Sequence, residues 1–320
     1  MTTVPLEGLV YQPVPGFEDH LEEELNFVCG AESPRAERLG PFYYLKNPSL
    51  TPDVELSTPP VFWHRNIWLS PVKIEFESIS EAAGALRDIQ RNWAPVFFTQ
   101  FRGGALIASK LPKISQKPRP FPWPLPEAPM GAWTLFDDHT LLASPRCSSP
   151  FPAGVIEFEE DRDGPPSRAY LKLWEALTRL GRLPRAGERC LDAGASPGGW
   201  TWALSRLGAG VIAVDRAALD ARIASMPGVT CLRHDAFTLK PEEIGPIDWL
   251  FSDVICYPSR LYEWIEKWLA SGLCGNFVCT IKMQGSADLD TPRRFAAIPG
   301  SRVLHLYHNK HELTWLKINF

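Results

Sequence analysis

The stretch that decides the fold is Asp192-Ala193-Gly194-Ala195-Ser196-Pro197-Gly198-Gly199-Trp200, which joins a short apolar run to an apolar helical stripe. Glycines let a backbone turn tightly and approach a ligand, and a proline suits the first turn of a helix. The exposed N–H groups at such a helix start favour an anion or a carboxylate. The glycine spacing is Gly-x-x-x-Gly-Gly rather than Gly-x-Gly-x-x-Gly, which disfavours NAD. The stretch therefore predicts a strand, a ligand-binding turn and a helix.

The rest of the second half continues this alternation of strands and helices. The predicted strands are 188–193, 211–215, 229–234, 247–253, 276–282, 302–307 and 313–318, with apolar helical stripes at 200–207 and 261–268. The last two strands are joined by the short loop 308–311, which permits only an antiparallel pair, because a parallel connection needs about a dozen residues. The pattern indicates an α/β, Rossmann-like domain, with a mostly parallel seven-stranded sheet that ends in a C-terminal antiparallel hairpin.

Two further acids follow predicted strands. Asp215 ends the strand after the glycine turn, where a carboxylate can accept both hydroxyls of a ribose. Asp235 follows the next strand, where it could accept a hydrogen bond from an adenine amino group. Either acid alone is typical of a solvated strand end. Together with the glycine turn they predict a nucleoside-binding edge.

The first half differs in composition, since 23 of the 31 prolines lie in residues 1–166. Periodicity predicts an amphipathic helix over 16–28, closed by Gly30, and a second helix over 80–93. Short β-like runs surround them at 72–76, 96–101, 105–111 and 154–158, with a hairpin across Asp137-Asp138. We expect an α+β region, divided into two small modules near Pro59-Pro60.

One stretch of this half is basic and aromatic. No acidic residue lies between Asp88 and Glu127, and six cations do: Arg91, Arg102, Lys110, Lys113, Lys117 and Arg119. Cations follow phosphates, and aromatic faces stack on unpaired bases, so the interleaved Trp93, Phe97, Phe98, Phe101, Phe121 and Trp123 favour RNA binding. The alternative is that the aromatic residues are core and the cations a solvated rim. The alternating prolines of 118–126 favour a stiff polyproline spacer.

Composition limits the classes that remain. The chain has 320 residues, 45% of them apolar and 22% charged, as is typical of a folded globular protein. Its net charge of −4 by itself argues against a nucleic-acid partner. The sequence holds no apolar run long enough to span a membrane, and the N-terminus has no signal-peptide pattern. Seven scattered cysteines without a Cys-x-x-Cys pair favour reduced thiols and a cytoplasmic location.

The glycine turn and its acids resemble the FtsJ-like family of S-adenosylmethionine-dependent RNA 2′-O-ribose methyltransferases. The segments that carry the resemblance are 167–173, Phe251-Ser252-Asp253-Val254, Thr280-Ile281-Lys282 and His311-Glu312-Leu313-Thr314. They match, in order, the Lys-Asp-Lys-Glu tetrad of that family. The end of the chain is most similar to the bacterial branch that methylates a cytidine ribose in large-subunit rRNA. That branch also carries an N-terminal ferredoxin-like module and a THUMP RNA-binding module.

The resemblance implies a domain layout and a set of binding residues. It implies a ferredoxin-like module over 1–58, a THUMP-like module over 59–160 and a catalytic domain over 161–320. The implied cofactor is S-adenosylmethionine and the implied partner is RNA, with no metal and no membrane. The implied cofactor-binding residues are Ser167, Asp192, Gly194, Ser196, Pro197, Gly198, Gly199, Trp200, Asp215, Asp235 and Asp253.

The implied catalytic residues are Lys172, Asp253, Lys282 and Glu312. A ribose 2′-hydroxyl is a weak acid, so a base must take its proton, and Lys282 is expected to be that base. An ammonium group cannot accept a proton, so we expect desolvation or the neighbouring Lys172 to lower the pKa of Lys282. Asp253 and Glu312 would orient the two lysines. Ser167 is expected to cap the helix of Lys172 or to bind the cofactor.

Several residues have a second interpretation. Lys172 shares a helical face with Arg168, Glu175 and Arg179, a stripe that periodicity alone assigns to solvent. The three histidines His305, His308 and His311 have metal-like spacing, but we expect their directions to diverge around the hairpin. Cys274 and Cys279 are expected in the core.

The sequence leaves other functions open. A THUMP-bearing base methylase would need an aromatic clamp after the fourth strand, where this chain has Asp253-Val254-Ile255-Cys256. The remaining alternatives are 2′-O-methylation of tRNA or another structured RNA, and small-molecule O-methylation. A different class would be a non-catalytic cofactor-binding factor in RNA binding or ribosome assembly.

Overall fold

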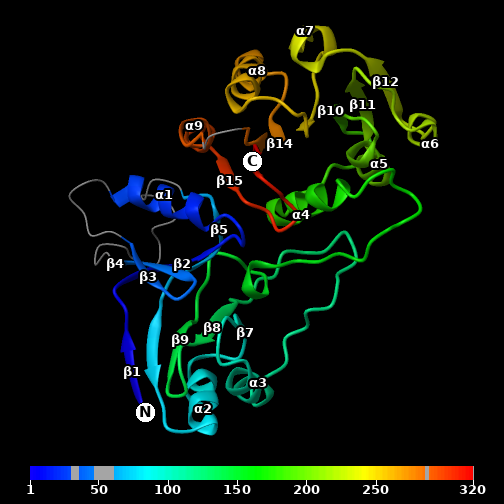
Figure 1. Cartoon of the computed structure of the whole chain (residues 1–320). Coiled ribbons are helices and arrows are strands. Elements are labelled where there is room, and N and C mark those ends of the chain that lie inside the picture. Colours follow the sequence, from blue (N-terminus) through cyan, green and yellow to red (C-terminus); the bar gives the residue numbers. More distant parts are fainter. Residues whose placement is uncertain (30–35, 47–60, 285–287, 320) are drawn as a thin grey trace. The chain divides into compact units, whose positions relative to one another are not determined.

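The computed structural model describes residues 1–29, 36–46, 61–284 and 288–319 (Figure 1). The chain divides into two compact units. The first comprises residues 1–119 and 125–157, and the second comprises residues 120–124 and 158–320. The domain layout expected from the sequence stays a prediction.

The second unit is built on one seven-stranded sheet of order β12-β11-β10-β13-β14-β16-β15. Its strands are β10 (Arg189–Ala193), β11 (Gly210–Asp215), β12 (Val229–Arg233), β13 (Trp249–Ser252), β14 (Asn276–Lys282), β15 (Ser301–Leu304) and β16 (Glu312–Lys317). The pairs from β12 to β14 are parallel, whereas β16 is antiparallel to both β14 and β15. The predicted Rossmann-like sheet with a terminal hairpin is confirmed. The hairpin loop is longer than expected, because β15 ends at Leu304.

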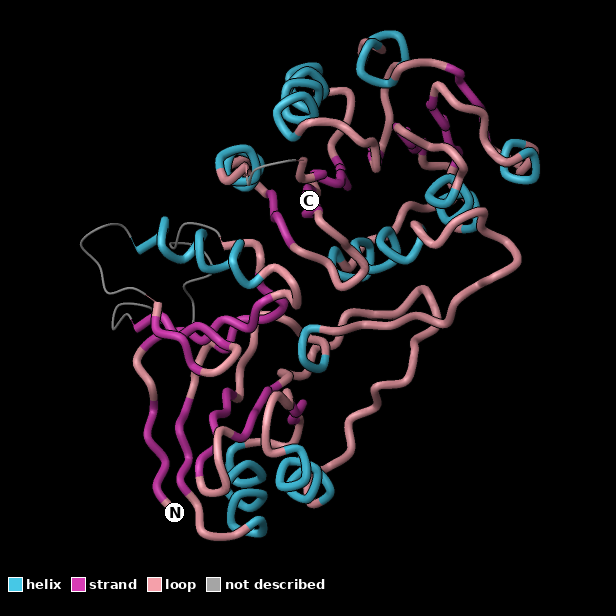
Figure 2. Tube along the Cα trace, viewed as in Figure 1, coloured by secondary structure: helices cyan, strands magenta, loops and turns pink. Residues whose placement is uncertain are grey.

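Helices alternate with these strands (Figure 2). They are α4 (Tyr170–Leu180), α5 (Gly199–Arg206), α6 (Ala221–Ala224), α7 (Pro241–Ile244), α8 (Pro258–Ser271) and α9 (Asp290–Ala296), with a 3-10 turn, η3, at Ala236–Thr238. The predicted stripe of α8 is buried at Leu261, Trp264, Ile265 and Trp268. Helix α4 is buried along most of its length, so both its apolar and its charged residues face protein.

The first unit contains two sheets. A four-stranded sheet has the order β3-β4-β2-β5, and a five-stranded sheet has the order β1-β6-β9-β8-β7. The strands are β1 (Thr2–Pro5), β2 (Gly8–Pro13), β3 (Glu37–Leu39), β4 (Phe42–Lys46), β5 (His64–Trp68), β6 (Val72–Glu75), β7 (Trp93–Pro95), β8 (Gly131–Leu135) and β9 (Thr140–Ser144). The helices are α1 (Glu18–Cys29), α2 (Ile79–Ile89) and α3 (Phe101–Ser109), with a 3-10 turn, η2, at Pro152–Gly154. The predicted hairpin across Asp137-Asp138 is confirmed as β8–β9.

Three strand predictions in this unit are wrong. The runs 96–101 and 105–111 were expected as strands, but 101–109 forms helix α3. A short apolar run cannot by itself distinguish a strand from a packed helix. The helix fits here because Gly103 packs beside Leu135, where a side chain would come into contact with it, and Gly104 leaves room for the ring of Phe97. The expected strand 154–158 is also absent, since η2 covers its start and the described residues that follow form no strand.

Three smaller expectations need adjustment. The helix expected over 80–93 ends at Ile89, so that Trp93 begins β7. The closing residue Gly30 lies outside the described residues. The proline-rich stretch 118–126 is more than a spacer, because residues 120–124 belong to the second unit and Phe121 stacks on Trp174 there.

Candidate active site

Four charged side chains form a closed ring in the second unit. The Nζ atom of Lys172 lies 2.9 Å from Oδ1 of Asp253 and 2.6 Å from Oε1 of Glu312. The Nζ atom of Lys282 lies 2.7 Å from the same Asp253 oxygen and 2.8 Å from Oε2 of Glu312. Each lysine thus contacts both carboxylates. We call these four residues the tetrad, and the structure brings all of its predicted members together.

Strand order explains how distant residues meet. Lys282 ends β14 and Glu312 begins β16, and the antiparallel register pairs these two residues directly. Asp253 follows β13, which is parallel to β14, so its carboxylate leaves the same edge of the sheet. Lys172 comes from the first turn of α4. Ligands in open α/β sheets bind at this carboxyl edge of the strands.

The tetrad is open on one side. The side chains of Lys172 and Glu312 are 7% and 8% exposed, whereas those of Lys282 and Asp253 are 18% and 17% exposed. A hydroxyl group that arrives from solvent therefore reaches Lys282 before Lys172. This asymmetry supports the prediction that Lys282 is the base.

The expected direction of the Lys282 pKa is wrong for this structure. Burial does lower the pKa of Lys282, but the charges of Asp253 and Glu312 outweigh it, so the pKa is raised. Burial likewise opposes ionisation of Asp253, yet the two lysines hold the pKa of that carboxyl below its usual range. With two cations and two anions, the tetrad is neutral as it stands, and Lys282 carries its proton at neutral pH.

A cavity of about 270 Å³ lies beside the tetrad. Five predicted cofactor-binding residues line it: Gly194, Ser196, Asp215, Asp235 and Asp253. The prediction missed Val214, Arg216, His234, Ala236, Phe237, Val254, Ile255 and Arg260, which also line it. Most of the missed residues directly follow β11, β12 or β13, so their place after predicted parallel strands was the signal that could have found them.

The glycine turn forms one wall of this cavity. Gly194 has a φ of +81°, and a side chain there would collide with Val254, so the position requires glycine. Asp215 braces the turn, because its Oδ2 accepts a hydrogen bond from the Ser196 N–H at 3.0 Å. Its Oδ1 accepts from the Ala217 N–H at 2.8 Å. Each oxygen keeps a second lone pair for a ligand hydroxyl.

The far wall carries Asp235 and an arginine that the sequence did not indicate. Oδ1 of Asp235 accepts a hydrogen bond from the Phe237 N–H, and Oδ2 lies 3.6 Å from a guanidinium nitrogen of Arg260. The same guanidinium lies over the ring of Phe237, 4.6 Å from its centroid. Arg260 thus fixes both an acid and an aromatic face at the cavity wall.

Other predicted residues support the turn from outside the cavity. Asp192 is 1% exposed and accepts a hydrogen bond of 2.6 Å from the Thr201 hydroxyl. Burial raises its pKa to about 7. The indole of Trp200 is buried and donates to the carbonyl of Ala169 at 2.9 Å, which ties α5 to the start of α4. Pro197 accepts from the Asp220 N–H, and Gly198 faces Ile223.

Ser167 does not cap the helix of Lys172. The cap position of α4 is Ala169, which makes no side-chain capping bond. The Ser167 hydroxyl is instead a buried oxygen without a hydrogen-bond partner, and it lies close to Gly199 because that residue has no side chain. A buried unpaired hydroxyl favours a ligand that can bond to it.

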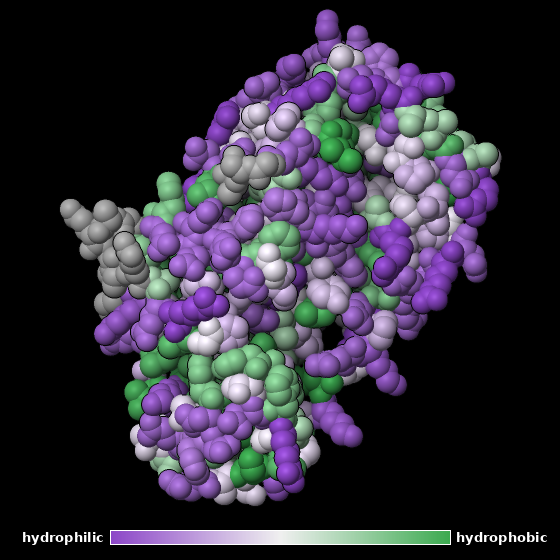
Figure 3. Space-filling model, in the orientation of Figure 1, coloured by the Kyte–Doolittle hydropathy of each residue, from purple (hydrophilic) through white to green (hydrophobic). Residues whose placement is uncertain are grey.

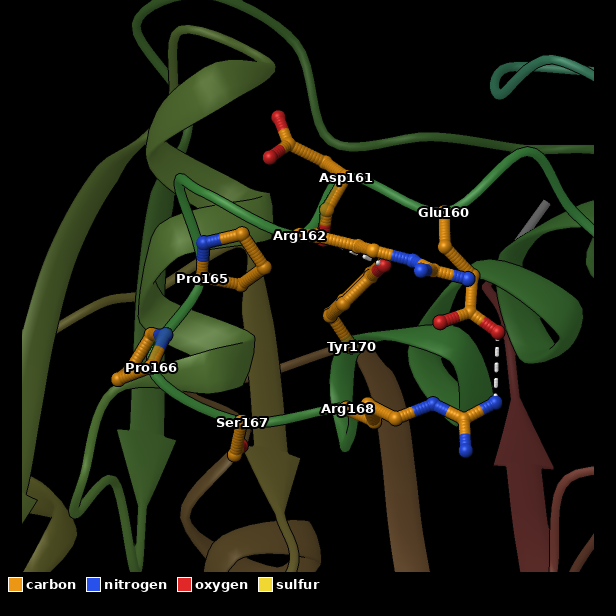
Figure 4. Close-up of a pocket in the computed structure, with 8 residues that line it drawn as sticks. All are labelled: Glu160, Asp161, Arg162, Pro165, Pro166, Ser167, Arg168 and Tyr170. Atoms are coloured by element: carbon orange, nitrogen blue, oxygen red, sulfur yellow. Dashed lines mark hydrogen bonds and ion pairs between the residues drawn. The ribbon is translucent and has the colours of Figure 1, made fainter.

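A second cavity, of about 410 Å³, includes Ser167 (Figure 4). It is lined by the chain just before α4: Glu160, Asp161, Arg162, Pro165, Pro166, Ser167, Arg168 and Tyr170. Figure 4 shows the Arg162 and Arg168 side chains extending towards Glu160, and an ion pair of 2.6 Å joins Arg168 to Glu160. The hydroxyl of Tyr170 donates to the carbonyl of Asp161 at 3.0 Å and holds the loop against the helix.

The cavity and the glycine turn offer S-adenosylmethionine space and hydrogen-bonding groups. The glycine turn leaves space that a side chain would fill, Ser167 offers an unpaired hydroxyl, and Asp215 keeps lone pairs for ribose hydroxyls. The carboxylate of Asp253 faces both the cavity and the tetrad. The residues fit the cofactor. Among the described residues, no group of His, Cys, Asp and Glu is arranged to hold a metal ion.

The six predicted RNA-binding cations lie in the first unit. Arg91, Arg102, Lys110, Lys113 and Lys117 are exposed, whereas Arg119 is half-buried and donates to the carbonyl of Ser115 at 3.0 Å. Their role stays a prediction.

Four of the six interleaved aromatic residues are packing residues, and one of these is Phe121, which stacks on Trp174. Trp93 is core, and Phe97 and Phe98 pack against Trp133 and Phe42. Phe101, at 62% exposure, is the large aromatic surface beside Arg102. Figure 3 shows hydrophobic residues in small groups among hydrophilic ones on the visible face. No helix of the described residues is long and apolar enough to cross a membrane.

The fold and the site define a class of protein, the FtsJ-like methyltransferases. The family model of that description matches residues 165–297, a range that includes three tetrad members and the glycine turn. A ribosomal RNA large subunit methyltransferase M from Xanthomonas oryzae pv. oryzae is 30% identical over 254 residues, covering 74% of this chain and 69% of that protein. The chain belongs to the ribosomal RNA large subunit methyltransferase M family.

Other relatives share less of their length. Proteins of the same name from Azoarcus sp. and Xylella fastidiosa are 34% and 36% identical over 185 and 197 residues. These matches cover 53% and 56% of this chain, and the chain spans about half the length of the two relatives (50% and 55%). A solved magnesium protoporphyrin IX methyltransferase from Synechocystis aligns with a TM-score of 0.35 and 17% identity, over 47% of this chain and 78% of that one.

Proposed function

We propose that the protein transfers a methyl group from S-adenosylmethionine to a ribose 2′-hydroxyl of RNA. The observation that carries this proposal is the closed tetrad at the carboxyl edge of the sheet, beside a cavity that fits the cofactor. Both lysines are held by the same two carboxylates. Such an arrangement suits proton removal from a weakly acidic hydroxyl.

The residues of this chain divide the chemistry among them. Bound S-adenosylmethionine supplies an electrophilic methyl group on a sulfonium. Lys282, the more exposed lysine, takes the proton of the 2′-hydroxyl once it has released its own proton to solvent. Asp253 and Glu312 hold its Nζ atom in place through two short contacts. Lys172 balances the carboxylate charges from the buried side of the tetrad, and with Lys282 it holds the pKa of Asp253 below its usual range.

The proposed substrate is a cytidine ribose in large-subunit (23S) rRNA. The names of the curated relatives support large-subunit rRNA, and the resemblance of the chain end supports cytidine. We further propose that residues 1–58 and 59–160 act as ferredoxin-like and THUMP-like RNA-binding modules, with the six cations on phosphates. A ribosomal substrate would place the protein in the cytoplasm.

The test is methyl transfer from tritiated S-adenosylmethionine to total RNA, followed by mapping of 2′-O-methyl sites in rRNA from cells with and without the protein. We expect the labelled methyl group to be incorporated into RNA. In cells without the protein, we expect one ribose methylation of large-subunit rRNA to be missing. An unchanged map, or label in tRNA, would overturn the rRNA assignment. Tight RNA binding without any incorporation would instead support a non-catalytic ribosome-assembly factor.

The base assignment has its own variant. Lys282→Ala should retain cofactor binding, because the cavity residues are unchanged, while methyl transfer falls by about a hundredfold or more. The matched control is Lys267→Ala, an exposed lysine of α8 outside the tetrad and the cavity, which should leave both properties unchanged. An active Lys282→Ala protein would refute the role of Lys282.

A further inference from the structure

Glu175 is a buried carboxylate that the tetrad does not contain. It lies one helical turn after Lys172 on α4, and its side chain is 0% exposed. An ionised carboxylate so deeply buried needs several partners. Burial alone would raise its pKa, but Arg179 and His308 outweigh burial and lower it, so the group is a carboxylate at neutral pH.

Two of the hydrogen-bond donors to Glu175 are peptide groups of the hairpin loop, and a third is on helix α4. Its Oε1 accepts a hydrogen bond of 3.0 Å from the Tyr307 N–H, and its Oε2 accepts one of 3.1 Å from the His308 N–H. Arg179, one turn further along α4, donates its Nε–H to Oε1 at 2.8 Å. Glu175 thus fixes two consecutive peptide groups of the β15–β16 loop to helix α4.

The same loop leads directly to Glu312. The side chain of Asn309 donates to the carbonyl of Glu312 at 3.1 Å and exchanges hydrogen bonds with the hydroxyl of Thr314. His305 contacts the carbonyl of Lys310 at 3.0 Å across the loop. A shift of residues 307 and 308 would therefore be transmitted to the backbone of Glu312 through a few hydrogen bonds of this loop.

We infer that Glu175 is a positioning residue for the tetrad, which sets the distance between Lys172 on α4 and Glu312 on the hairpin. Glu175 is not among the residues that line either cavity. The kinetic test of the inference rests on the proposed function. Lys172 and Glu175 are three residues apart on helix α4. This one rigid element therefore carries both Lys172 and the carboxylate that holds the loop leading to Glu312.

The test compares Glu175→Gln with Glu188→Gln. A glutamine at 175 keeps the size but turns an acceptor into an NH₂ group, which faces a peptide N–H and weakens the clamp. Glu188 is a suitable control, because it is also a largely buried acceptor, bonded to the indole of Trp249 at the other end of the sheet. We expect kcat of Glu175→Gln to fall at least ~10-fold, with KM for RNA and cofactor affinity within about threefold of wild type. A kcat no lower than that of Glu188→Gln would overturn the inference.

A second measurement does not depend on activity. Lysine acylation followed by mass spectrometry reports how well Lys172 and Lys282 are paired, because a lysine that loses a carboxylate partner becomes a better nucleophile. Both lysines should react faster in Glu175→Gln than in wild type, and equally fast in Glu188→Gln and wild type. If the wild-type protein methylates no RNA, the proposed function fails while this labelling still decides the role of Glu175.

A third variant covers the case in which Glu175→Gln does not fold. Asn309→Ser leaves the Glu175 clamp intact but removes the amide that holds the Glu312 carbonyl. It should lower kcat and increase labelling of the two lysines in the same way. Unchanged labelling in a folded Asn309→Ser protein would show that the loop does not position Glu312.

Discussion

The protonation state of Lys282 is the feature of the tetrad that most affects its chemistry. A general base must be deprotonated, yet Asp253 and Glu312 raise the pKa of this lysine. The carboxylates that position the Nζ atom therefore also hold its proton. Activity should rise with pH, because the reactive form of Lys282 grows as its pKa is approached from below.

Glu312→Gln tests this balance. The variant keeps a hydrogen-bond acceptor beside Lys282 but removes one negative charge, so the pKa of Lys282 should fall. The increase of kcat with pH should then occur at lower pH than in wild type, although the maximum rate falls because the tetrad is disturbed. The measurement is kcat between about pH 7 and pH 10 at saturating substrates. A profile that stays in place, or moves to higher pH, would contradict the assignment of Lys282 as base.

Single residues also show the limit of sequence reasoning. The tetrad was predictable because the segments that hold its members resemble, in order, motifs of the FtsJ-like family, and because Asp253 and Lys282 lie at the ends of neighbouring strands. Glu175 was not, because helical periodicity assigns it to a charged stripe with Lys172 and Arg179. Besides Arg179, its partners are the peptide groups of Tyr307 and His308, more than a hundred residues away, and no local pattern signals a long-range backbone contact.

At the scale of elements, strand β10 contains a carboxyl group whose ionisation is opposed by burial in the folded state. Asp192 has an ordinary pKa of 3.8 and a folded pKa of about 7. The folded state therefore binds a proton that the unfolded state releases, and the free energy of unfolding falls as pH rises from about 4 to about 7. Above about pH 7, the free energy of unfolding falls no further on account of Asp192.

Asp192→Asn should remove this pH dependence. The amide oxygen can still accept from Thr201, and no charge is buried at high pH. The difference in unfolding free energy between variant and wild type should grow in favour of the variant from about pH 4 to pH 7, by at most on the order of 4 kcal/mol. Urea denaturation at pH 5 and pH 8 measures it, with Asp290→Asn as an exposed control. A difference that stays constant with pH would argue against a raised pKa.

Elements of the second unit were easier to predict than those of the first. Each strand from β10 to β16 is an apolar run bounded by turn residues, so its existence was predictable and only its ends shifted. Helix α3 was predicted as strands because 96–101 and 105–111 are short apolar runs of the kind that strands also have. The glycines permit close packing on Leu135 and Phe97, a tertiary contact that outweighs local preference.

At the scale of the whole molecule, the net charge of −4 conceals an uneven distribution. Five exposed cations of the predicted RNA-binding stretch lie in the first unit. If they contact phosphates, the affinity for RNA depends on salt through the release of counterions.

Lys113→Gln combined with Lys117→Gln should weaken RNA binding and lower the slope of log K against log salt by about 0.7 per lost phosphate contact. Cofactor affinity should not change. Lys46→Gln with Lys73→Gln removes the same charge from exposed positions of β4 and β6 in the same unit, and should leave the slope unaltered. Equal slopes for both double variants would refute the predicted interface.

The segment 120–124 has a consequence for how such a protein can evolve. The chain passes into the second unit for these residues and returns to the first until residue 157. Within the second unit, Phe121 lies parallel to Trp174 at 4.6 Å and edge-on to Phe158 at 6.0 Å. A recombination event that joined a new RNA-binding half at one point near residue 158 would thus remove an aromatic side chain from the catalytic half. We expect the two halves to be exchanged between lineages rarely, and to diverge together.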